Sequence, residues 1–284
     1  MSREFPQRFE THVTVEAGGV RPDSLLSGAS GLSKSQVKRV MDAGAVWLTR
    51  GRRTQRLRRA SRTLRAGEEL HLYYDAAILT LAPPTPDLIH DAGQYSVWDK
   101  PPGMLSQGSR YGDHCAAPRY AEKHLRPQRN AFTVHRLDRA ASGLMVIAHS
   151  RQTAARLSAL FSAREVVKRY HVAVSGRLDA RGEALVLDTP VDGKPARSRV
   201  RTVRFDDAAN VSLLEVEIET GRKHQIRAHL AAHGFPVVGD RLYGSSIQSV
   251  DLRLRAVALE FRCPIAGENR RFAVETPWWD APGG

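Results

Sequence analysis

Apolar residues recur along the chain at the spacings of helices and of strands. Repeats of about 3.6 residues predict helices, and alternating or continuous apolar runs predict strands. The predicted helices are Ser33–Ala43, Arg151–Arg164 and Arg222–His233. The predicted strands are Val46–Leu48, Leu144–Ala148, Leu214–Ile218 and Leu252–Phe261. A turn that leads into another strand is predicted over Ala66–Tyr74. Short strands with few helices between them predict an α+β fold around a mostly antiparallel sheet.

A proline-rich stretch divides the chain. Pro83, Pro84 and Pro86 disfavour helix and favour extended backbone, which predicts a linker between two folded parts. A length of 284 residues is also long for a single hydrophobic core. We therefore expect a small domain over residues 10–76, a linker over 77–87 and a larger domain over 88–284.

The charge of the chain indicates a polyanionic partner. Lys and Arg number 43 against 30 Asp and Glu, so the formal net charge is +13. Nucleic acid, an anionic membrane surface and acidic partners all fit that charge, and composition alone does not separate them. No apolar run approaches the ~20 residues that cross a bilayer, and the polar N-terminus lacks the apolar core of a secretory signal. We therefore expect no membrane association.

The cysteines give no sign of a disulfide framework or a metal site. Cys115 and Cys263 are the two cysteines of the chain, and neither lies in a CxxC pair. The neighbouring His114 has no further ligands at metal-binding spacing. Both cysteines fit ordinary thiols in a reducing cytosol, so we expect a cytoplasmic protein without a metal.

Eight arginines occur between residues 50 and 65 with no acidic residue among them. A solvated charged loop is the simpler interpretation of such a run. Without compensating acids, however, these side chains repel one another unless a polyanion lies nearby. Guanidinium groups also match phosphate oxygens in pairs. We expect Arg52, Arg53 and Arg56 to contact RNA phosphates.

A polar loop between two apolar segments holds a candidate catalytic carboxylate. Asp138 lies between Phe132–Val134 and Leu144–Ala148, with Ser142–Gly143 suited to a tight turn. The residues around it in the sequence include three that can carry positive charge, His135, Arg136 and Arg139. Nearby cations keep a carboxylate ionised, and an ionised aspartate can act as a nucleophile or a base. The alternative is an aspartate that only caps or bridges the loop.

Residues 135–144 of the larger domain read His-Arg-Leu-Asp-Arg-x-x-Ser-Gly-Leu. This string resembles the active-site signature of the RluA-type pseudouridine synthases. Further stretches resemble family motifs in the same order, namely Val97–Met104, Val167–Val172, Glu219–Leu230 and Gly234–Gly244. The resemblance covers roughly Asp87 to Pro264. It departs from the family at Ala141, where a Thr is usual.

The small domain contains the stretch Gly31–Met41, a short strand after it, and an Arg-Ala-Gly-Glu-Glu-Leu turn at residues 65–70. These features resemble the S-four-type (alpha-L) RNA-binding domain. Pro22 departs from the usual start of that domain. The resemblance implies that Lys34, Lys38 and Arg39 lie on a helix that faces RNA.

The family resemblance implies an isomerase that turns uridine in RNA into pseudouridine, with a central mixed, mostly antiparallel sheet. It implies that Asp138 is the essential carboxylate, that Tyr170 lies against the uracil, and that Arg227 pairs with the acid. It also implies that the enzyme extrudes its target base, and that Arg136 fills the space left behind. We expect phosphate contacts from Arg222 and His224, RNA contact from Arg139, and either backbone contact or loop support from His135.

This chemistry needs no cofactor. We expect a monomer that acts on RNA, with large-subunit ribosomal RNA preferred and transfer RNA possible. A non-catalytic ribosome-associated RNA-binding protein is the main rival, and it would not need Asp138. A metal-dependent nuclease would need clustered carboxylates, which the sequence does not show.

Overall fold

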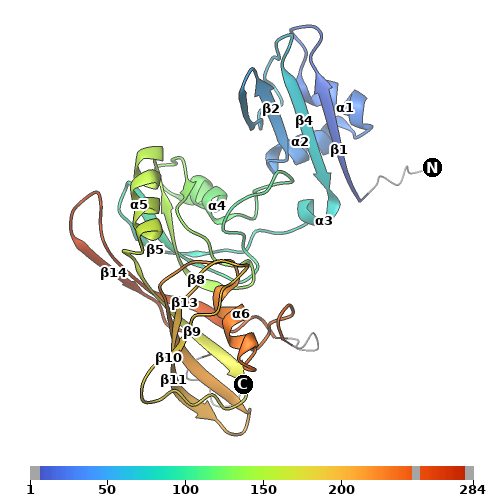
Figure 1. Ribbon diagram of the computed structural model, residues 1–284. Coiled ribbons are helices and arrows are strands. Elements are labelled where there is room, and N and C mark those ends of the chain that lie inside the picture. Colours follow the sequence, from blue (N-terminus) through green and yellow to red (C-terminus); the bar gives the residue numbers. More distant parts are fainter. Residues whose placement is uncertain (1–6, 245–249, 279–284) are drawn as a thin grey trace. The chain divides into compact units, whose positions relative to one another are not determined.

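The computed structural model describes residues 7–244 and 250–278, and the chain divides into two compact units (Figure 1). The first unit holds the chain up to Pro83 together with Gln107–Lys123. The second holds Pro84–Ser106 and the chain from His124 onward. The sequence-based boundaries place residues 107–123 in the larger domain. In the structure this segment packs with the first unit, where Asp113 pairs with Arg58 at 2.5 Å.

The first unit is built on a four-stranded antiparallel sheet. Its strands lie in the order β1 (Arg8–Thr14), β4 (Glu69–Asp75), β2 (Val46–Arg50) and β3 (Arg53–Arg56). Helices α1 (Pro22–Ser30) and α2 (Lys34–Asp42) pack against the sheet and close an apolar core. The short helix α3 (Ala76–Leu79) follows β4, and α4 (Ala117–His124) begins in the 107–123 segment.

Helix α2 matches the predicted helix closely, and its local sequence explains where it begins. The side chain of Ser33 accepts a hydrogen bond from the Gln36 backbone, and the Gln36 side chain accepts one from the Ser33 backbone. This reciprocal pair satisfies amide groups that a helix start leaves without partners. Val37, Val40 and Met41 then form the buried face. Their burial leaves the lysines of the helix on its outer side.

The second unit contains a ten-stranded sheet, counted over the described residues. Its main path runs β10 (Leu185–Leu187), β11 (Ser198–Asp206), β12 (Val211–Ile218), β9 (Val167–Ser175), β13 (Leu254–Arg262), β8 (Ser142–Ala148), β6 (Tyr95–Lys100) and β5 (Asp87–Asp91). Strand β14 (Asn269–Ala273) pairs with β13, and β7 (Phe132–Thr133) pairs with β8. Helix α5 (Arg151–Ala163) contacts β8, and α6 (Gln225–Ala232) contacts β11.

The predicted α+β class with a mixed, mostly antiparallel sheet is confirmed for this unit. Only β8 and β13 run parallel among the described strand pairs of the sheet. Most strands present one face to the two apolar clusters of the unit. Within the described residues, no helix is both long enough and apolar enough to span a membrane.

Two predicted elements differ from the observed ones. The helix predicted over Arg222–His233 begins only at Gln225, because His224 adopts a left-handed backbone with φ of 56°. Strand β13 begins at Leu254, and its buried residues do not simply alternate. A β-bulge between Ala256 and Ala258 shifts the register, so four consecutive residues from Ala256 onward are buried.

The Ser142–Gly143 pair was predicted to form a tight turn, and this was wrong. Both residues open strand β8. Gly143 has φ of +108°, and a Cβ atom there would overlap the backbone of Ala256 on β13. Glycine at this position therefore permits the close parallel approach of β8 and β13 directly after the Asp138 loop.

Candidate active site

The Asp138 loop connects β7 to β8, and two buried side chains from the chain before it hold its backbone. The hydroxyl of Ser106 donates to the Leu137 carbonyl at 2.7 Å and accepts from the Leu137 amide at 2.9 Å. The Lys100 amine donates to the carbonyls of Ala141 at 2.6 Å and Arg139 at 3.4 Å. Backbone groups on both sides of Asp138 are thus fixed from within the protein, which sets the direction of its carboxylate.

Lys100 is the most unusual cation of the site because it has no exposed surface. Besides the loop, its amine reaches the carbonyl oxygens of Pro101 and Met104, each at 3.0 Å. Burial lowers the pKa of Lys100 to about 7, although the charges of Asp138 and Asp99 act in the opposite direction. The amine therefore donates hydrogen bonds to backbone carbonyls beneath the loop and does not face solvent.

Arg227 on α6 contacts Asp138 directly. Its Nη1 atom donates to Oδ2 of Asp138 at 2.9 Å. The Arg227 side chain is 8% exposed and that of Asp138 is 20% exposed, so the pair lies at a pocket wall and not on the open surface. Burial opposes the charge of Arg227, but hydrogen bonds from it to Asp240 and Asp138 outweigh burial and raise its pKa. The cation stays charged beside the carboxylate.

Tyr170 on β9 lines the same pocket. The pocket has a volume of about 70 Å³, and Arg136, Asp138, Tyr170 and His224 are among the residues that line it. Burial, with a smaller contribution from the charge of Asp138, raises the pKa of Tyr170, so the phenol is protonated at neutral pH. Its hydroxyl makes no hydrogen bond to the part of the chain that the structure describes.

His224 stands on the other side of the carboxylate. Its Nε2 atom lies 3.8 Å from Oδ1 of Asp138, and its Nδ1 atom lies 3.3 Å from the Tyr243 hydroxyl. Burial lowers the pKa of His224, with Asp138 acting in the opposite direction. Arg222, three residues before the start of α6, is half-buried and donates to the Pro195 carbonyl at 3.0 Å. The structure therefore brings His224 to the carboxylate and Arg222 to the pocket edge.

The cations that flank Asp138 in the sequence do not pair with it. His135 turns away, stacks on Phe161 with ring centroids 4.3 Å apart, and accepts a hydrogen bond from the Val146 amide at 3.0 Å. Burial lowers the pKa of His135 to about 3, so the ring is neutral. Arg139 donates to the Gly103 carbonyl at 3.2 Å. These neighbours therefore do not pair with the acid, and its ion-pair partner is Arg227 on α6, as the family resemblance implied.

Two alternatives left open by the sequence can now be described. Of the two roles weighed for His135, the hydrogen bond from the Val146 amide to its Nε2 atom favours loop support. Arg136 is exposed at the pocket, and its side chain makes no hydrogen bond or ion pair within the described chain. Ala141, which replaces the usual Thr, is buried against the pocket.

The arginine-rich segment of the first unit is partly neutralised by acids outside it. Glu68 pairs with Arg50 at 2.5 Å and with Arg62 at 3.3 Å. Asp113 pairs with Arg56 at 3.2 Å. The premise that these arginines lack compensating acids was therefore wrong, because the acids lie further along the chain.

The three arginines expected on phosphates differ in their surroundings. Arg56 lies over the Trp47 ring at 4.2 Å, pairs with Asp113, and donates to the Ser109 carbonyl at 2.8 Å. It is thus held inside the unit. Arg52 and Arg53 are exposed, and their side chains have no hydrogen-bond or ion-pair partner among the described residues. These two remain open to a polyanion.

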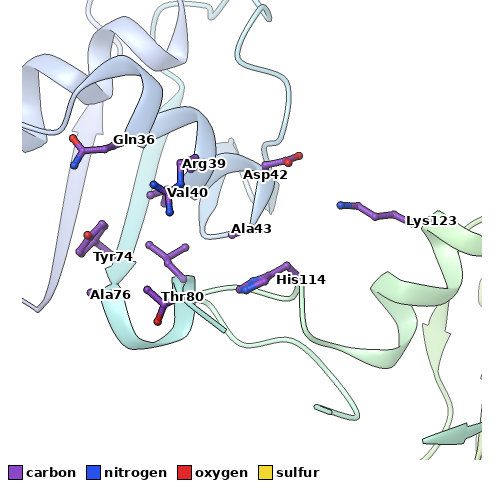
Figure 2. A pocket seen from close by; sticks show the side chains of 11 residues that line it. Gln36, Arg39, Val40, Asp42, Ala43, Tyr74, Ala76, Thr80, His114 and Lys123 are labelled. Atoms are coloured by element: carbon purple, nitrogen blue, oxygen red, sulfur yellow. The ribbon is translucent and has the colours of Figure 1, made fainter. Parts of the chain in front are cut away.

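The predicted cations of α2 lie on its exposed side. Lys34 and Lys38 are exposed, and Lys38 lies 3.6 Å from the buried carboxylate of Asp23. Arg39 lines a pocket of about 280 Å³ within the first unit, together with His114 (Figure 2). The structure therefore places these cations on one helix, with a hollow beside the last of them.

Three residues that hold the site escaped sequence reasoning: Lys100, Ser106 and Asp240. Lys100 and Asp240 stand inside stretches that resemble family motifs, so their positions were visible but their partners were not. Asp240 is completely buried and binds Arg227 through both carboxylate oxygens, each at 2.7 Å. Ser106 lies outside these stretches, and no local pattern in the sequence indicated its role.

Comparison with known proteins identifies the family. Residues 94–232 match the RNA pseudouridylate synthase family. An RNA pseudouridine synthase of Chloroflexus aurantiacus is 34% identical over 90% of this chain and 86% of its own length. The ribosomal large subunit pseudouridine synthase D of Xanthomonas campestris is 32% identical over 76% of this chain and 74% of its own. A human protein, RNA pseudouridylate synthase domain containing 1, has a TM-score of 0.58 at 19% identity over 70% of this chain and 87% of its own, and it shares the fold.

The chain therefore belongs to the RNA pseudouridine synthases. Within them it is of the RluA type, and it is an isomerase that modifies RNA.

Proposed function

We propose that this enzyme converts specific uridines of large-subunit ribosomal RNA to pseudouridine, with Asp138 as its catalytic carboxylate. The observation that carries the proposal is the position of Asp138, which meets Arg227 through one oxygen at the wall of a pocket shared with Tyr170. The ribosomal preference is supported by the name of the Xanthomonas relative. We expect the enzyme to act as a monomer in the cytoplasm.

The reaction is a rearrangement within one nucleotide. The bond between N1 of uracil and C1′ of ribose breaks, and a bond between C5 and C1′ forms. C5 loses a proton and N1 gains one, so atoms and electrons balance without a cofactor. Asp138 can attack the base, attack the sugar, or remove a proton from the sugar, and all three roles need an ionised oxygen free to reach the nucleotide.

Tyr170 and Arg227 assist in different ways. The Tyr170 ring offers an apolar face on which a uracil can stack. Because its raised pKa keeps the phenol protonated, the hydroxyl suits hydrogen bonding to the base better than service as a phenolate. Arg227 holds the charge of Asp138 and fixes its direction. Arg136, exposed beside the acid, is free to fill the stack from which the uridine is extruded.

The first unit fits the role of an S-four-type RNA-binding domain in this proposal. Lys34, Lys38 and Arg39 are exposed on helix α2, and Arg52 and Arg53 are exposed at the turn between β2 and β3. Phosphate contacts of this kind add affinity without reading the base sequence. The target site would then be selected mainly by RNA shape and by the fit of the extruded base.

Pseudouridine mapping tests the proposal. Ribosomal and transfer RNA from a strain lacking the gene should each be mapped chemically, before and after restoring the wild type or Asp138→Asn. We expect ribosomal sites to disappear, to return with the wild type, and to stay absent with Asp138→Asn while RNA affinity is retained. Loss confined to transfer RNA would reassign the substrate. Full modification by Asp138→Asn would remove Asp138 from catalysis.

A further inference from the structure

Asp240 is a fully buried carboxylate directly behind the Asp138–Arg227 pair. Its side chain is 0% exposed. Its Oδ2 atom accepts a hydrogen bond from Nε of Arg227, and its Oδ1 atom accepts one from Nη2, both at 2.7 Å. Oδ1 also accepts from the amides of Leu242 at 2.9 Å and Tyr243 at 3.1 Å. Burial acts against the charge, but these donors outweigh it and hold the pKa of Asp240 below its usual range.

This arrangement uses up one edge of the Arg227 guanidinium. The group presents its N–H donors in a rigid planar fork that prefers to bind a carboxylate through two parallel hydrogen bonds. Asp240 takes that bidentate position. Both N–H groups of Nη1 and one of Nη2 remain, but the orientation that Asp240 fixes brings only Nη1 to Asp138, where it donates to Oδ2 at 2.9 Å. Oδ1 of Asp138 is left without a donor from Arg227.

A second contact extends the same anchor to the other side of the site. The two backbone hydrogen bonds to Asp240 fix the turn that carries Tyr243. The Tyr243 ring lies 5.3 Å from the Arg227 guanidinium, and its hydroxyl lies 3.3 Å from Nδ1 of His224. His224 in turn lies 3.8 Å from Oδ1 of Asp138. One buried acid thus supports both groups that flank the reactive carboxylate.

We propose that Asp240 is a positioning residue that restricts Arg227 to a single contact with Asp138 and so keeps Oδ1 of Asp138 open to the uridine. The inference rests on the proposed catalytic role of Asp138. Without the charge of Asp240, the guanidinium is free to turn and bind both oxygens of Asp138. That bidentate pair would cap the carboxylate that has to reach the nucleotide.

The test compares Asp240→Asn with the wild type in two measurements. Single-turnover conversion of a uridine-containing RNA gives the rate, and filter binding gives the RNA Kd. We expect the rate to fall by about 10- to 100-fold with the Kd changed less than threefold, because about 1.4–2.7 kcal/mol of transition-state positioning is lost. A crystal structure of the variant should show Arg227 bound to both oxygens of Asp138.

A matched control is Asp91→Asn. Asp91 also accepts hydrogen bonds from an arginine, Arg129, and from a backbone amide, that of Gly93 at 2.9 Å, within the same unit. It lies on β5, outside the pocket described above. We expect this variant to keep its rate and Kd within twofold of the wild type.

Several outcomes would overturn the proposal. A wild-type rate in Asp240→Asn would do so, as would a crystal structure in which Arg227 keeps its single contact with Asp138. Equal losses of rate and RNA affinity would indicate a structural role only. If Asp240→Asn does not fold, Asp240→Glu serves as the second variant, because it keeps a charged carboxylate against Arg227. Its rate should stay within about tenfold of the wild type, and a larger fall in a folded variant whose Arg227 keeps its single contact with Asp138 would refute the idea.

The same experiments separate this inference from the proposed function. If the wild type converts no uridine in any RNA, the proposed function fails. The crystal structure of Asp240→Asn still reports where the Arg227 guanidinium goes. Conversely, an active wild type with an unaffected Asp240→Asn variant refutes the role of Asp240 alone.

Discussion

Replacing Lys100 by methionine removes the amine that donates hydrogen bonds to backbone carbonyls beneath Asp138, while it keeps an unbranched apolar side chain. The amine lies 2.6 Å from the Ala141 carbonyl and 3.0 Å from those of Pro101 and Met104. A hydrogen bond to a charged donor contributes roughly 1.5–3 kcal/mol, and burying the charge offsets part of that gain. We expect Lys100→Met to lower the free energy of unfolding by about 2–4 kcal/mol at pH 7.

The pH dependence of this loss tests the charge state of Lys100. Burial lowers its pKa in the folded chain to about 7, against 10.5 as the ordinary value. Between these values the unfolded chain holds a proton that the folded chain lacks, so the wild-type free energy of unfolding rises with pH by up to about 1.4 kcal/mol per unit. This pH-dependent contribution to stability is complete above the pKa of Lys100 in the unfolded chain, and it is lost as the pH falls to about 7. Methionine has no such proton, so the destabilisation should grow by about 2 kcal/mol from pH 7 to pH 9.

Urea unfolding followed by circular dichroism at both pH values measures these differences. Lys194→Met is the control, because Lys194 is exposed and its loss should change stability by less than about 0.5 kcal/mol. An equal loss at pH 7 and pH 9 would show that the carbonyl groups keep the Lys100 proton in place despite burial. No loss at either pH would refute the anchoring role itself.

Four further substitutions test other parts of the structure. Arg53→Ala should reduce the slope of log RNA affinity against log salt by about 1, whereas Arg56→Ala, in the same strand, should leave that slope unchanged and lower stability, as filter binding and thermal unfolding would show. The free energy of unfolding should fall less steeply below pH 6.5 in His135→Phe than in the wild type, because folded His135 excludes a proton that the unfolded chain binds. Urea unfolding at several pH values should show that the slope of this free energy against pH is smaller by up to about 1.4 kcal/mol per pH unit. Gly143→Ala should destabilise the second unit by more than about 2 kcal/mol, because the new Cβ overlaps the Ala256 backbone.

Each of these has an outcome that contradicts it. An Arg53→Ala variant with an unchanged salt slope would mean that this arginine is only solvated. A salt slope that falls equally for Arg56→Ala would mean that Arg56 leaves its internal partners to bind RNA. If the free energy of unfolding of His135→Phe depends on pH as that of the wild type does, His135 binds its proton in the folded chain as well. Normal stability of Gly143→Ala would show that β8 and β13 can separate at that point.

Sequence patterns located the main elements of the fold because the signals were local. Helix α2 was predicted from its cap residue and its apolar spacing, both contained within eleven residues. Strand β8 was predicted from a continuous apolar run and is buried along its whole length. The mixed sheet, in contrast, depends on which strands pair across long separations. Only the family resemblance predicted it, since spacing along one strand says nothing about its neighbours.

The same distinction applies to the site. The order of the family-like stretches brought Asp138, Tyr170 and Arg227 into one hypothesis, and the structure places all three at or beside one pocket. The partners of charged groups were harder to predict. The cations next to Asp138 in the chain were expected to contact it, but His135 and Arg139 bind other groups. The contact with Arg227, 89 positions away, agrees with the pairing that the family resemblance implied. Backbone direction decides such pairing, as His135 shows by turning into the interior.

The geometry around Asp138 also suits what the reaction demands. A uracil that leaves C1′ must turn and return to the same carbon, so the proposed catalytic oxygen has to keep its position through the whole event. Flexible surface charges would not hold it there. Buried groups do, since Lys100 and Ser106 fix the loop backbone from below and Asp240 fixes the guanidinium that directs the carboxylate. Because these contacts are made within the protein itself, substrate binding does not have to supply the energy of ordering the acid. The energy of binding is then left for extruding and turning the base.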